Sequence, residues 1–528
     1  YSDILETPTL GSTTDLYMSN GISAYVSGNR NPATQSWSFT ALRDINYLLE
    51  HLDQCKDRAV ANKYEAVGRF FRADFYFKLV RAYGDVPYYD HVLGSADKDI
   101  YKGRDDRGYV MDKVLEDFDF AIANLPGTWE ELNTRVTKWA ALGYASRAAL
   151  FEGTFRKYHG MNDADKYLKA CAEYGKAFIE GSPFSLYNEG ATPYRDLFSS
   201  VDAKTQEVVL CRHYDMQYGV VHGLGNQISF GRSSLTRRFV NHYLMADGTR
   251  FTDKDGWETM FYTDEVKGRD PRLAQTVLCP GYVQVGASSV TPCEFYSWTG
   301  YEPIKHVPSA ERCVSSSDDT DWILLRAPEV YLNYAEAKAE LGALTQSDLD
   351  ISVNKIRARA KMPSLNMADA NASPDPYLVQ CYPNVNKGEN RGVILEIRRE
   401  RTVELALEEP ERVWDMFRWA EAKQCLQHYV PWHGVYVPGL GSYDTTGDGK
   451  ADVEFVKVAT GAVKIKVGTK VQDVVLSNGD SGNIVSYSTT DYGYLWDDAR
   501  DYLWPIPAKD RTLNPNLSQN YGYVDGVD

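Results

Sequence analysis

The sequence predicts a mostly α-helical fold, built from stacked, tetratricopeptide-like helical hairpins with inserted loops and short β-strands or hairpins. Over residues 37–180 and 326–425, apolar residues recur at intervals of three and four positions, which is the spacing of one face of a helix. Over 181–325 and 430–503 this period weakens, and Gly, Ser, Asp and Pro separate short apolar runs. Such stretches are typical of loops with a few strands. The helical pairs begin at no constant interval, so we expect one domain over residues 1–528, with insertions between its hairpins.

The first part of the chain contains a leader and five predicted helices. Residues 1–36 are polar and rich in Gly, Ser, Thr and Asn, so we expect them to be extended. The helices that follow have these apolar stripes: Leu42, Ile45, Leu49 and Leu52; Ala66, Phe70, Ala73, Phe77 and Val80; Val110, Val114, Phe118, Ala121 and Leu125; the run 137–152; and Tyr167, Cys171, Tyr174 and Phe178. Gly84 and Pro87 end the second helix, and Thr137 caps the fourth.

Another helical pair is predicted over 326–342 and 347–363. Pro328 lies where a first-turn proline is tolerated, because the amide hydrogen that it lacks would have no partner there. Ser347 and Asp350 have the spacing of a capping box at the start of the second helix. Apolar residues recur at helical intervals in both segments.

The next segment, 394–422, combines apolar residues with many charges. Pro410 is expected to begin a new helix there, because its ring excludes it from a helix interior. The charges are either a site for an anionic ligand or ion pairs within and between helices, for instance Arg401 with Glu404. We favour ion pairs, because the two signs are balanced and no cleft is implied. The residues are Arg398, Arg399, Glu400, Arg401, Glu404, Glu408, Arg412, Asp415 and Arg418.

Short strands are predicted in both loop-rich regions. EVVLC (207–211) and WILL (322–325) are apolar runs between turn-forming residues. VEFVKV (453–458) and VKIKV (463–467) alternate apolar and polar residues on either side of a short connection. This second pattern predicts a β-hairpin.

Several rarer motifs, taken in order, resemble those of the SusD/RagB family, which are nutrient-capturing surface lipoproteins of Bacteroidetes. They are FFRADFYFKLVRAYGDVP (70–87), YLMADGTR (243–250), RDPRL (269–273), RAPEVYLNYAEAKAELG (326–342), NKIRARA (354–360), RERTVEL (399–405), RVWDMFRW (412–419) and the C-terminal motif YLWPIPAKDRTLNPNLSQNYGY (502–523). The resemblance spans nearly the whole chain. One departure is EEPER (408–412), where the family usually has Glu-Gly before the arginine.

The resemblance implies a fold of four degenerate tetratricopeptide-like repeats and a function. The protein would bind oligosaccharides or polysaccharides at the cell surface and deliver them to a SusC-like TonB-dependent transporter. A lipidated cysteine upstream of residue 1 would anchor it to the extracellular face of the outer membrane. The RagB side of the family implies one alternative, the capture of peptides. A glycan hydrolase is a further alternative from another class.

Composition excludes some classes of protein. The formal net charge of −16 argues against nucleic acid as a partner, because phosphate binding needs a basic surface. No run of about 18 apolar residues occurs, so no transmembrane helix is expected. The chain begins at Tyr1, so we expect a processed leader upstream. The eight cysteines show no metal-ligand spacing; most should be buried, and Cys279–Cys293 or Cys293–Cys313 would be the disulfides if any form.

No catalytic motif is present. The sequence has no GxSxG, no HExxH, no P-loop, and no GxGxxG after a strand. Its carboxylates are numerous, but glycosidase chemistry depends on the separation of two of them, which a sequence does not give. We therefore expect no enzyme and no catalytic cofactor.

Aromatic residues in loops are the candidate ligand-binding residues. A sugar ring has an apolar face that packs on flat Trp or Tyr side chains, while neighbouring polar groups bind its hydroxyls. Each ring could equally pack beneath its own loop. The candidates are Tyr88 and Tyr89; Tyr296, Trp298 and Tyr301; and Trp432 and Tyr436.

The segment YDTTGDGKADVE (443–454) resembles a calcium-binding loop. Candidate ligands are Asp444, Thr446, Asp448, the carbonyl of Lys450, and Asp452, with Gly449 at the turn. Position 12 is Phe455 instead of glutamate, so we expect weak binding of a structural Ca²⁺. The alternative is a turn stabilised by Asp side chains, without a metal.

Overall fold

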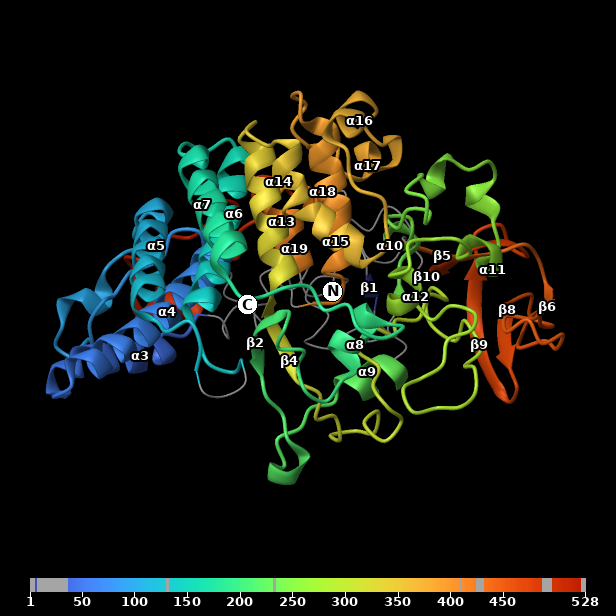
Figure 1. Ribbon diagram of the computed structural model, residues 1–528, viewed down its shortest axis with the longest axis horizontal. Helices are drawn as coiled ribbons and strands as arrows, with labels where there is room; N and C mark the ends of the chain where they lie inside the picture. Colours follow the sequence, from blue (N-terminus) through green and yellow to red (C-terminus); the bar gives the residue numbers. More distant parts are fainter. Residues whose placement is uncertain are drawn as a thin grey trace.

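The structure is a computed structural model, and it confirms the predicted fold class. Helices lie side by side in a row, and a β-sheet lies at one end of that row (Figure 1). The model describes residues 5–6, 37–129, 133–230, 234–408, 411–423, 432–486 and 496–523. Most of the predicted leader, 1–36, therefore lies outside the described residues. Within the described residues, no helix is both long and apolar enough to cross a membrane.

The first five helices form the packed pairs that the apolar stripes predict. α3 packs against α4, α4 against α5, α5 against α6 and α6 against α7. Asp57, Asp106 and Thr137 cap α4, α5 and α6, because their side-chain oxygens accept N–H groups of the first turn. The bounds are α3 (Thr40–Glu50), α4 (Arg58–Tyr83), α5 (Arg107–Asn124), α6 (Lys138–Tyr158) and α7 (Ala164–Gly181).

The second helical region continues the row, because α13 packs against α6, α7 and α18. The predicted helix over 347–363 is two short helices, separated where Ser352 leaves the helical conformation. Its capping box is Thr345 with Asp348, not Ser347 with Asp350. The predicted start at Pro410 lies outside the described residues, and the next helix begins at Glu411. The bounds are α13 (Ala327–Glu340), α14 (Gln346–Asp350), α15 (Val353–Arg359), α18 (Arg391–Glu404) and α19 (Glu411–Arg418).

Shorter elements fill the rest of the described chain. The predicted runs near 208 and 322 pair as antiparallel strands, β2 (Val208–Arg212) and β4 (Trp322–Arg326). β1 (Leu5–Glu6) pairs with β3 (Ser234–Leu235). The short helices are α8 (Pro193–Ser199), α9 (Leu224–Phe230), α10 (Arg237–Val240), α11 (Tyr262–Glu265), α12 (Leu273–Thr276), α16 (Met367–Ala372), α17 (Pro376–Cys381) and α21 (Ala508–Leu513).

The predicted hairpin is part of a six-stranded antiparallel sheet with the order β5-β10-β9-β8-β7-β6. Phe455 of β7 lies opposite Ile465 of β8, as the alternation predicts. β10 returns to pair with β5 and completes the sheet. The strands are β5 (Trp432–Val437), β6 (Gly441–Tyr443), β7 (Val453–Lys457), β8 (Val463–Val467), β9 (Lys470–Leu476) and β10 (Gly482–Ser486).

α18 joins the two main hydrophobic clusters of the protein. Ile394 and Ile397 belong to the cluster among the helices. Val403 and the following Ala406 belong to the cluster beneath the sheet. The cysteines of the described residues are free thiols, and six of the seven are buried, so neither disulfide considered from the sequence is formed.

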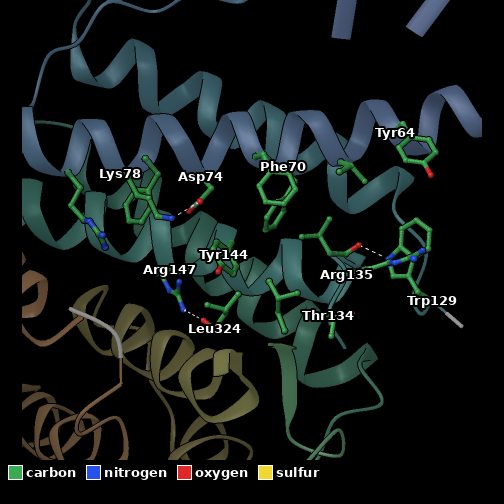
Figure 2. A pocket seen from close by; sticks show the side chains of 16 residues that line it. Tyr64, Phe70, Asp74, Lys78, Trp129, Thr134, Arg135, Tyr144, Arg147 and Leu324 are labelled. Atoms are coloured by element: carbon green, nitrogen blue, oxygen red, sulfur yellow. Dashed lines mark hydrogen bonds and ion pairs between the residues drawn. The ribbon is translucent and has the colours of Figure 1, made fainter. Parts of the chain in front are cut away.

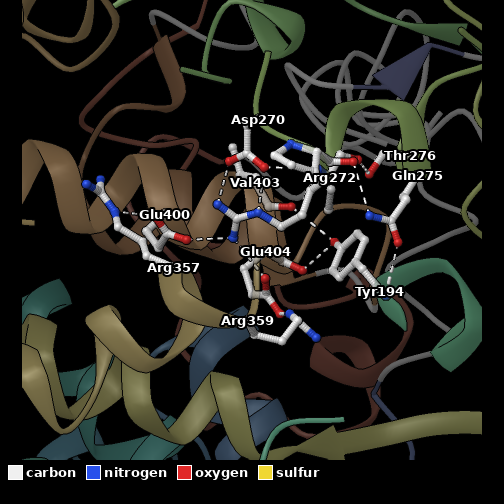
Figure 3. Close-up of polar contacts among 12 residues, drawn as sticks. Tyr194, Asp270, Arg272, Gln275, Thr276, Arg357, Arg359, Glu400, Val403 and Glu404 are labelled. Carbon is white, nitrogen blue, oxygen red and sulfur yellow. Dashed lines mark hydrogen bonds and ion pairs between the residues drawn. The ribbon is translucent and has the colours of Figure 1, made fainter. Parts of the chain in front are cut away.

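Most of the charged residues of 394–422 are buried and form ion pairs, which confirms that interpretation. The example pair of Arg401 with Glu404 is wrong, because Arg401 Nε binds Asp415 at 2.8 Å. Glu404, on the last turn of α18, contacts three arginines from other parts of the chain. Figure 3 shows two of them, Arg272 and Arg359. Arg272 Nη1 lies 2.9 Å from its carboxylate and Arg326 Nη1 lies 2.6 Å from it; Arg359 forms the third ion pair. Burial alone would raise the pKa of Glu404, but the three guanidinium groups bring that pKa well below its ordinary value.

We expect Glu404→Gln to lower the free energy of unfolding by about 3–5 kcal/mol, because it leaves three buried arginines without their shared anion. Since the pKa of Glu404 is depressed in the folded state, its contribution is present above the ordinary glutamate pKa of about 4.3 and is lost as pH falls below it. The difference between variant and wild type should therefore shrink on acidification. Urea denaturation at pH 7 and at pH 3.5 measures both effects.

Glu454→Gln is the matched control. Glu454 lies 3.9 Å from Lys466 at the sheet surface, and both side chains are nearly half exposed. Exposed pairs of this kind contribute less than about 1 kcal/mol. Equal destabilisation by the two substitutions would contradict the structural role assigned to Glu404.

Candidate functional site

The loop that carries Tyr296 and Trp298 runs against β5, the strand that carries Tyr436. The amide of Val435 donates to the carbonyl of Thr299 at 2.8 Å. Thr299 lies directly over Gly434, where an added Cβ would come within 1.9 Å of the Thr299 carbonyl oxygen. Glycine is therefore required at 434. Tyr436 follows in β5, beyond a register shift in the pairing of β5 with β10.

This loop is held by contacts with two neighbouring segments. The amide of Trp298 donates to Ser234 Oγ at 2.8 Å, and Gln472 Nε2 donates to the carbonyl of Ser297 at 3.3 Å. Lys470 Nζ forms an ion pair with Glu294 at 2.9 Å and lies 5.5 Å from the centre of the Tyr296 ring. Tyr296, Trp298 and Tyr436 are all partly exposed. We refer to these three residues as the loop platform.

Of the other two predicted residues of this region, one has a side chain that is not described and the other is buried. Trp432 lies in β5, but its side chain is outside the described part of the structure. Tyr301 is fully buried, and its hydroxyl donates to both oxygens of Glu265, at 3.0 and 2.8 Å. The prediction for Tyr301 is therefore wrong. Glycine and proline neighbours identified a loop, but this part of the loop crosses the hydrophobic cluster beneath the sheet.

Tyr88 and Tyr89 lie far from the platform, because they follow α4 at the other end of the molecule (Figure 1). Tyr88 is buried and packs against Tyr76, with 4.7 Å between ring centres. Its ring cannot be offered to a ligand, so the prediction for Tyr88 is wrong. Tyr89 is partly exposed, and Lys102 Nζ lies 5.5 Å from its ring centre.

The predicted calcium loop is closed by its own hydrogen bonds. Asp444 accepts amide hydrogens from Thr446, Gly447 and Gly449 at 3.1, 2.6 and 2.7 Å. The N–H groups of Gly449 and Gly447 lower the pKa of Asp444. Within the described residues, no group of three or more His, Cys, Asp or Glu side chains is placed to hold a metal ion. Asp448 and Lys450 are exposed. The loop has the hydrogen bonds of an Asp-stabilised turn, and calcium binding stays a prediction.

A pocket that sequence reasoning missed lies between α4, α6, the segment around Trp129 and strands β2 and β4 (Figure 2). Its volume is about 550 Å³, within the range of small-ligand sites. Tyr64 and Phe71 on α4 form one wall and are 49% and 45% exposed. Trp129 comes from a different segment and lies across from Tyr64 in Figure 2. We refer to this cavity as the α4 pocket.

The sequence contained a signal for this pocket. α4 has the predicted buried stripe, which includes Phe70, and beside it a second apolar stripe of Val60, Tyr64, Val67 and Phe71 at intervals of four, three and four. The residues of the first stripe alone fill the hydrophobic core beside α4. A large apolar side chain that stays exposed to water loses about 1.5–3 kcal/mol of stabilisation that burial would give. A second exposed stripe of this kind therefore marks a binding surface.

Comparisons with known proteins agree with this architecture. Residues 203–523 match the model of the SusD family, and residues 7–150 match a model described as "Starch-binding associating with outer membrane". SusD-like protein P38 of Formosa agariphila is 26% identical over 384 residues. That match covers 67% of this chain and 66% of the relative, which is just under two thirds of the relative's length.

Solved structures share the fold. A SusD-like carbohydrate binding protein from Bacteroides fragilis NCTC 9343 superposes with a TM-score of 0.67 at 20% identity, covering 98% of this chain and 91% of that one. A structure described as a complex with xylogluco-oligosaccharide superposes with a TM-score of 0.58 at 17% identity, covering 96% and 92%. The family model matches well over half of this chain, and the helical row and inserted sheet agree with these folds, so the chain belongs to the SusD family.

Proposed function

We propose that this protein captures oligosaccharides or polysaccharides at the outer membrane without cleaving them. The observation that carries the proposal is the loop platform, where partly exposed aromatic rings are held in place before any ligand arrives. A pre-ordered site avoids the entropic cost of fixing its side chains on binding. Flat aromatic faces surrounded by polar groups suit sugar rings. The carbohydrate-binding descriptions of related proteins support the same class of ligand.

The chemistry near the platform supports binding without catalysis. Burial and the nearby carboxylate of Glu294 raise the pKa of Glu302 to about 7, a value that would suit a general acid. However, Glu302 Oε1 is shielded from water and has no hydrogen-bond partner in the structure. A proton donor must come within hydrogen-bond reach of its substrate. Glu302 therefore makes a poor catalytic acid, although a hydrolase remains an outcome that the test below detects.

The proposal extends to the cell surface. The protein would pass its ligand to a SusC-like TonB-dependent transporter, with the helical row as the docking face and the platform turned to the ligand. A lipidated cysteine upstream of the present residue 1 would hold it on the extracellular face of the outer membrane. Family membership supports this arrangement. Co-purification of the full-length protein with such a transporter from outer membranes tests it, and recovery of the protein alone would contradict it.

We expect Trp298→Ala, and likewise Trp432→Ala, to weaken binding of the cognate glycan about fivefold or more, because a stacked ring contributes roughly 1 kcal/mol. A screen of plant, host and microbial polysaccharides identifies the ligand, and isothermal titration calorimetry then measures the affinities. Tyr218→Ala is the matched control, because Tyr218 is 81% exposed on a separate turn.

Three results would contradict the proposal. Unchanged affinity in both tryptophan variants would refute the platform as the site. Binding of peptides but of no glycan would select the peptide-capturing alternative. Release of shorter sugars on long incubation would identify a hydrolase.

Calcium binding by residues 444–452 also stays a proposal. We expect affinity on the order of 10⁻⁴ M, because the loop lacks the bidentate glutamate at position 12. Calorimetric titration of a chelator-treated sample should show heat and a higher melting temperature at millimolar Ca²⁺. Asp448→Asn should remove both effects, since the exposed Asp448 carboxylate accepts only one amide, from Lys450 at 2.9 Å. No heat and no rise in the wild type would leave the metal-free turn as the correct interpretation.

A further inference from the structure

We propose that the α4 pocket is a second glycan site, distinct from the loop platform, and that it takes uncharged sugar rings. The choice of a sugar as the ligand rests on the proposed function. The choice of an uncharged sugar rests on the side chains that line the pocket. The two choices fail in different experiments.

Exposed aromatic rings form one wall of the pocket. Tyr64 and Phe71 are seven residues apart on α4, so they share one face of the helix at a spacing of about two turns. Phe71 packs edge-on against Phe70, with 5.3 Å between ring centres, and Phe70 lies 5.1 Å from the ring of Tyr144 on α6. Phe70 and Tyr144 are buried. The exposed ring of Phe71 therefore rests on a buried aromatic layer, and its position is set before a ligand arrives.

A second wall comes from a different segment of the chain. Trp129 lies across from Tyr64 (Figure 2), and its indole N–H donates to the carbonyl of Val136 at 2.8 Å. This hydrogen bond fixes the plane of the Trp129 ring. Leu210 of β2 and Leu324 of β4 also line the cavity, whose volume is about 550 Å³. Flat aromatic surfaces in a cavity of this size suit the apolar faces of sugar rings.

Three of the charged side chains in the lining belong to ion pairs within the protein. Lys78 Nζ lies 2.7 Å from Asp74. Arg147 binds both carboxylate oxygens of Glu329, at 2.6 and 2.7 Å, and also donates to the carbonyl of Leu324 at 3.0 Å. The charges of Lys78, Asp74 and Arg147 are therefore compensated without a ligand.

The other two charged side chains of the lining are stacked on aromatic rings. The guanidinium carbon of Arg81 lies 4.4 Å from the centre of the Trp414 ring, and that of Arg135 lies 5.5 Å from the centre of the Trp129 ring. Such cation–π contacts are favourable for arginine. Both arginines also have further interactions with the protein. All the charged side chains of the lining thus have partners before a ligand binds.

These contacts limit the chemistry of the ligand. A carboxylate or phosphate group would have to displace partners that the protein already supplies. A wholly apolar occupant would take water away from Lys78, whose side chain is 59% exposed, without replacing its hydrogen bonds, which is costly for a charged group. A neutral sugar avoids both costs. Its apolar face packs on the rings, and its hydroxyls can donate to Asp74, whose carboxylate accepts several hydrogen bonds.

The test uses isothermal titration calorimetry with neutral trisaccharides of glucose, galactose, mannose and xylose, and with trigalacturonate as the acidic counterpart of galactotriose. Titrations in Trp298→Ala isolate the pocket, because the platform is weakened there. We expect a neutral trisaccharide to bind this variant equally well in low and high salt, because an uncharged ligand has no charge for ions to screen. Adding Phe71→Ala or Tyr64→Ala should weaken that binding about fivefold or more, as for the loss of one stacked ring. Trigalacturonate should bind no more tightly than galactotriose.

Tyr109→Ala is the matched control. Tyr109 is 48% exposed on α5, outside the lining of the pocket, so its removal should leave the affinity unchanged. Melting curves show whether each variant is folded. Equal weakening by Tyr109→Ala and Phe71→Ala would overturn the pocket as the site. Tighter and salt-sensitive binding of trigalacturonate would overturn the choice of a neutral sugar.

The remaining outcomes separate this site from the platform. If Trp298→Ala weakens glycan binding and Phe71→Ala changes nothing in either background, the second site falls and the proposed function stands. If Phe71→Ala weakens binding and neither Trp298→Ala nor Trp432→Ala does, the pocket stands and the platform falls. If no glycan binds the wild-type protein, the proposed function and the second site both fall.

Discussion

The buried ion network around Glu404 is the interaction on which the rest of the structure depends. Three arginines from separate segments bind this carboxylate: Arg326 at the junction of β4 and α13, Arg359 at the end of α15, and Arg272 just before α12. One carboxylate therefore holds three segments against α18. A second layer extends the network, since Arg326 also contacts Glu207 at 2.9 Å and Glu408 at 2.6 Å. Charges buried in this way must stay paired, because an unpaired buried charge costs several kcal/mol. The helical row and the region beneath the sheet are therefore held in a single relative arrangement.

The sequence revealed the parts of this fold whose signals are local. The stripes of α3 to α7 and of α13 predicted helices, and the alternation of β7 and β8 predicted a hairpin, because periodicity depends on near neighbours alone. The balanced charges of 394–422 correctly indicated ion pairs. Their partners were not predictable: Glu404 pairs with Arg272, 132 residues away, and no local pattern encodes that contact. For the same reason no local pattern indicated that β5 and β10 would extend the hairpin into a six-stranded sheet.

The candidate site shows the same limit at the level of single residues. Trp298 and Tyr301 lie three residues apart in one glycine-containing loop, yet one is partly exposed and the other is buried against Glu265. Their exposure differs because the loop between them packs on Gly434, a contact between segments that are distant in the sequence. The α4 pocket was missed for the opposite reason. Its signal was local, a second apolar stripe beside the first, but the candidate ligand-binding aromatics were taken from loops alone.

The separation of the two surfaces has a functional consequence. β5, which carries Tyr436, lies at one end of the molecule and α4 lies toward the other, with α18, which carries Glu404, between them (Figure 1). Coupling between two sites requires a structural element with two arrangements, whose equilibrium both ligands shift. A buried ion network that must keep every charge paired allows only one arrangement. Short sugars would therefore bind the two surfaces independently. A polysaccharide long enough to reach both would gain affinity by tethering, because once one surface holds the chain, its effective concentration at the other is raised. On a rigid frame that gain depends on the length of the glycan, without any change in the protein.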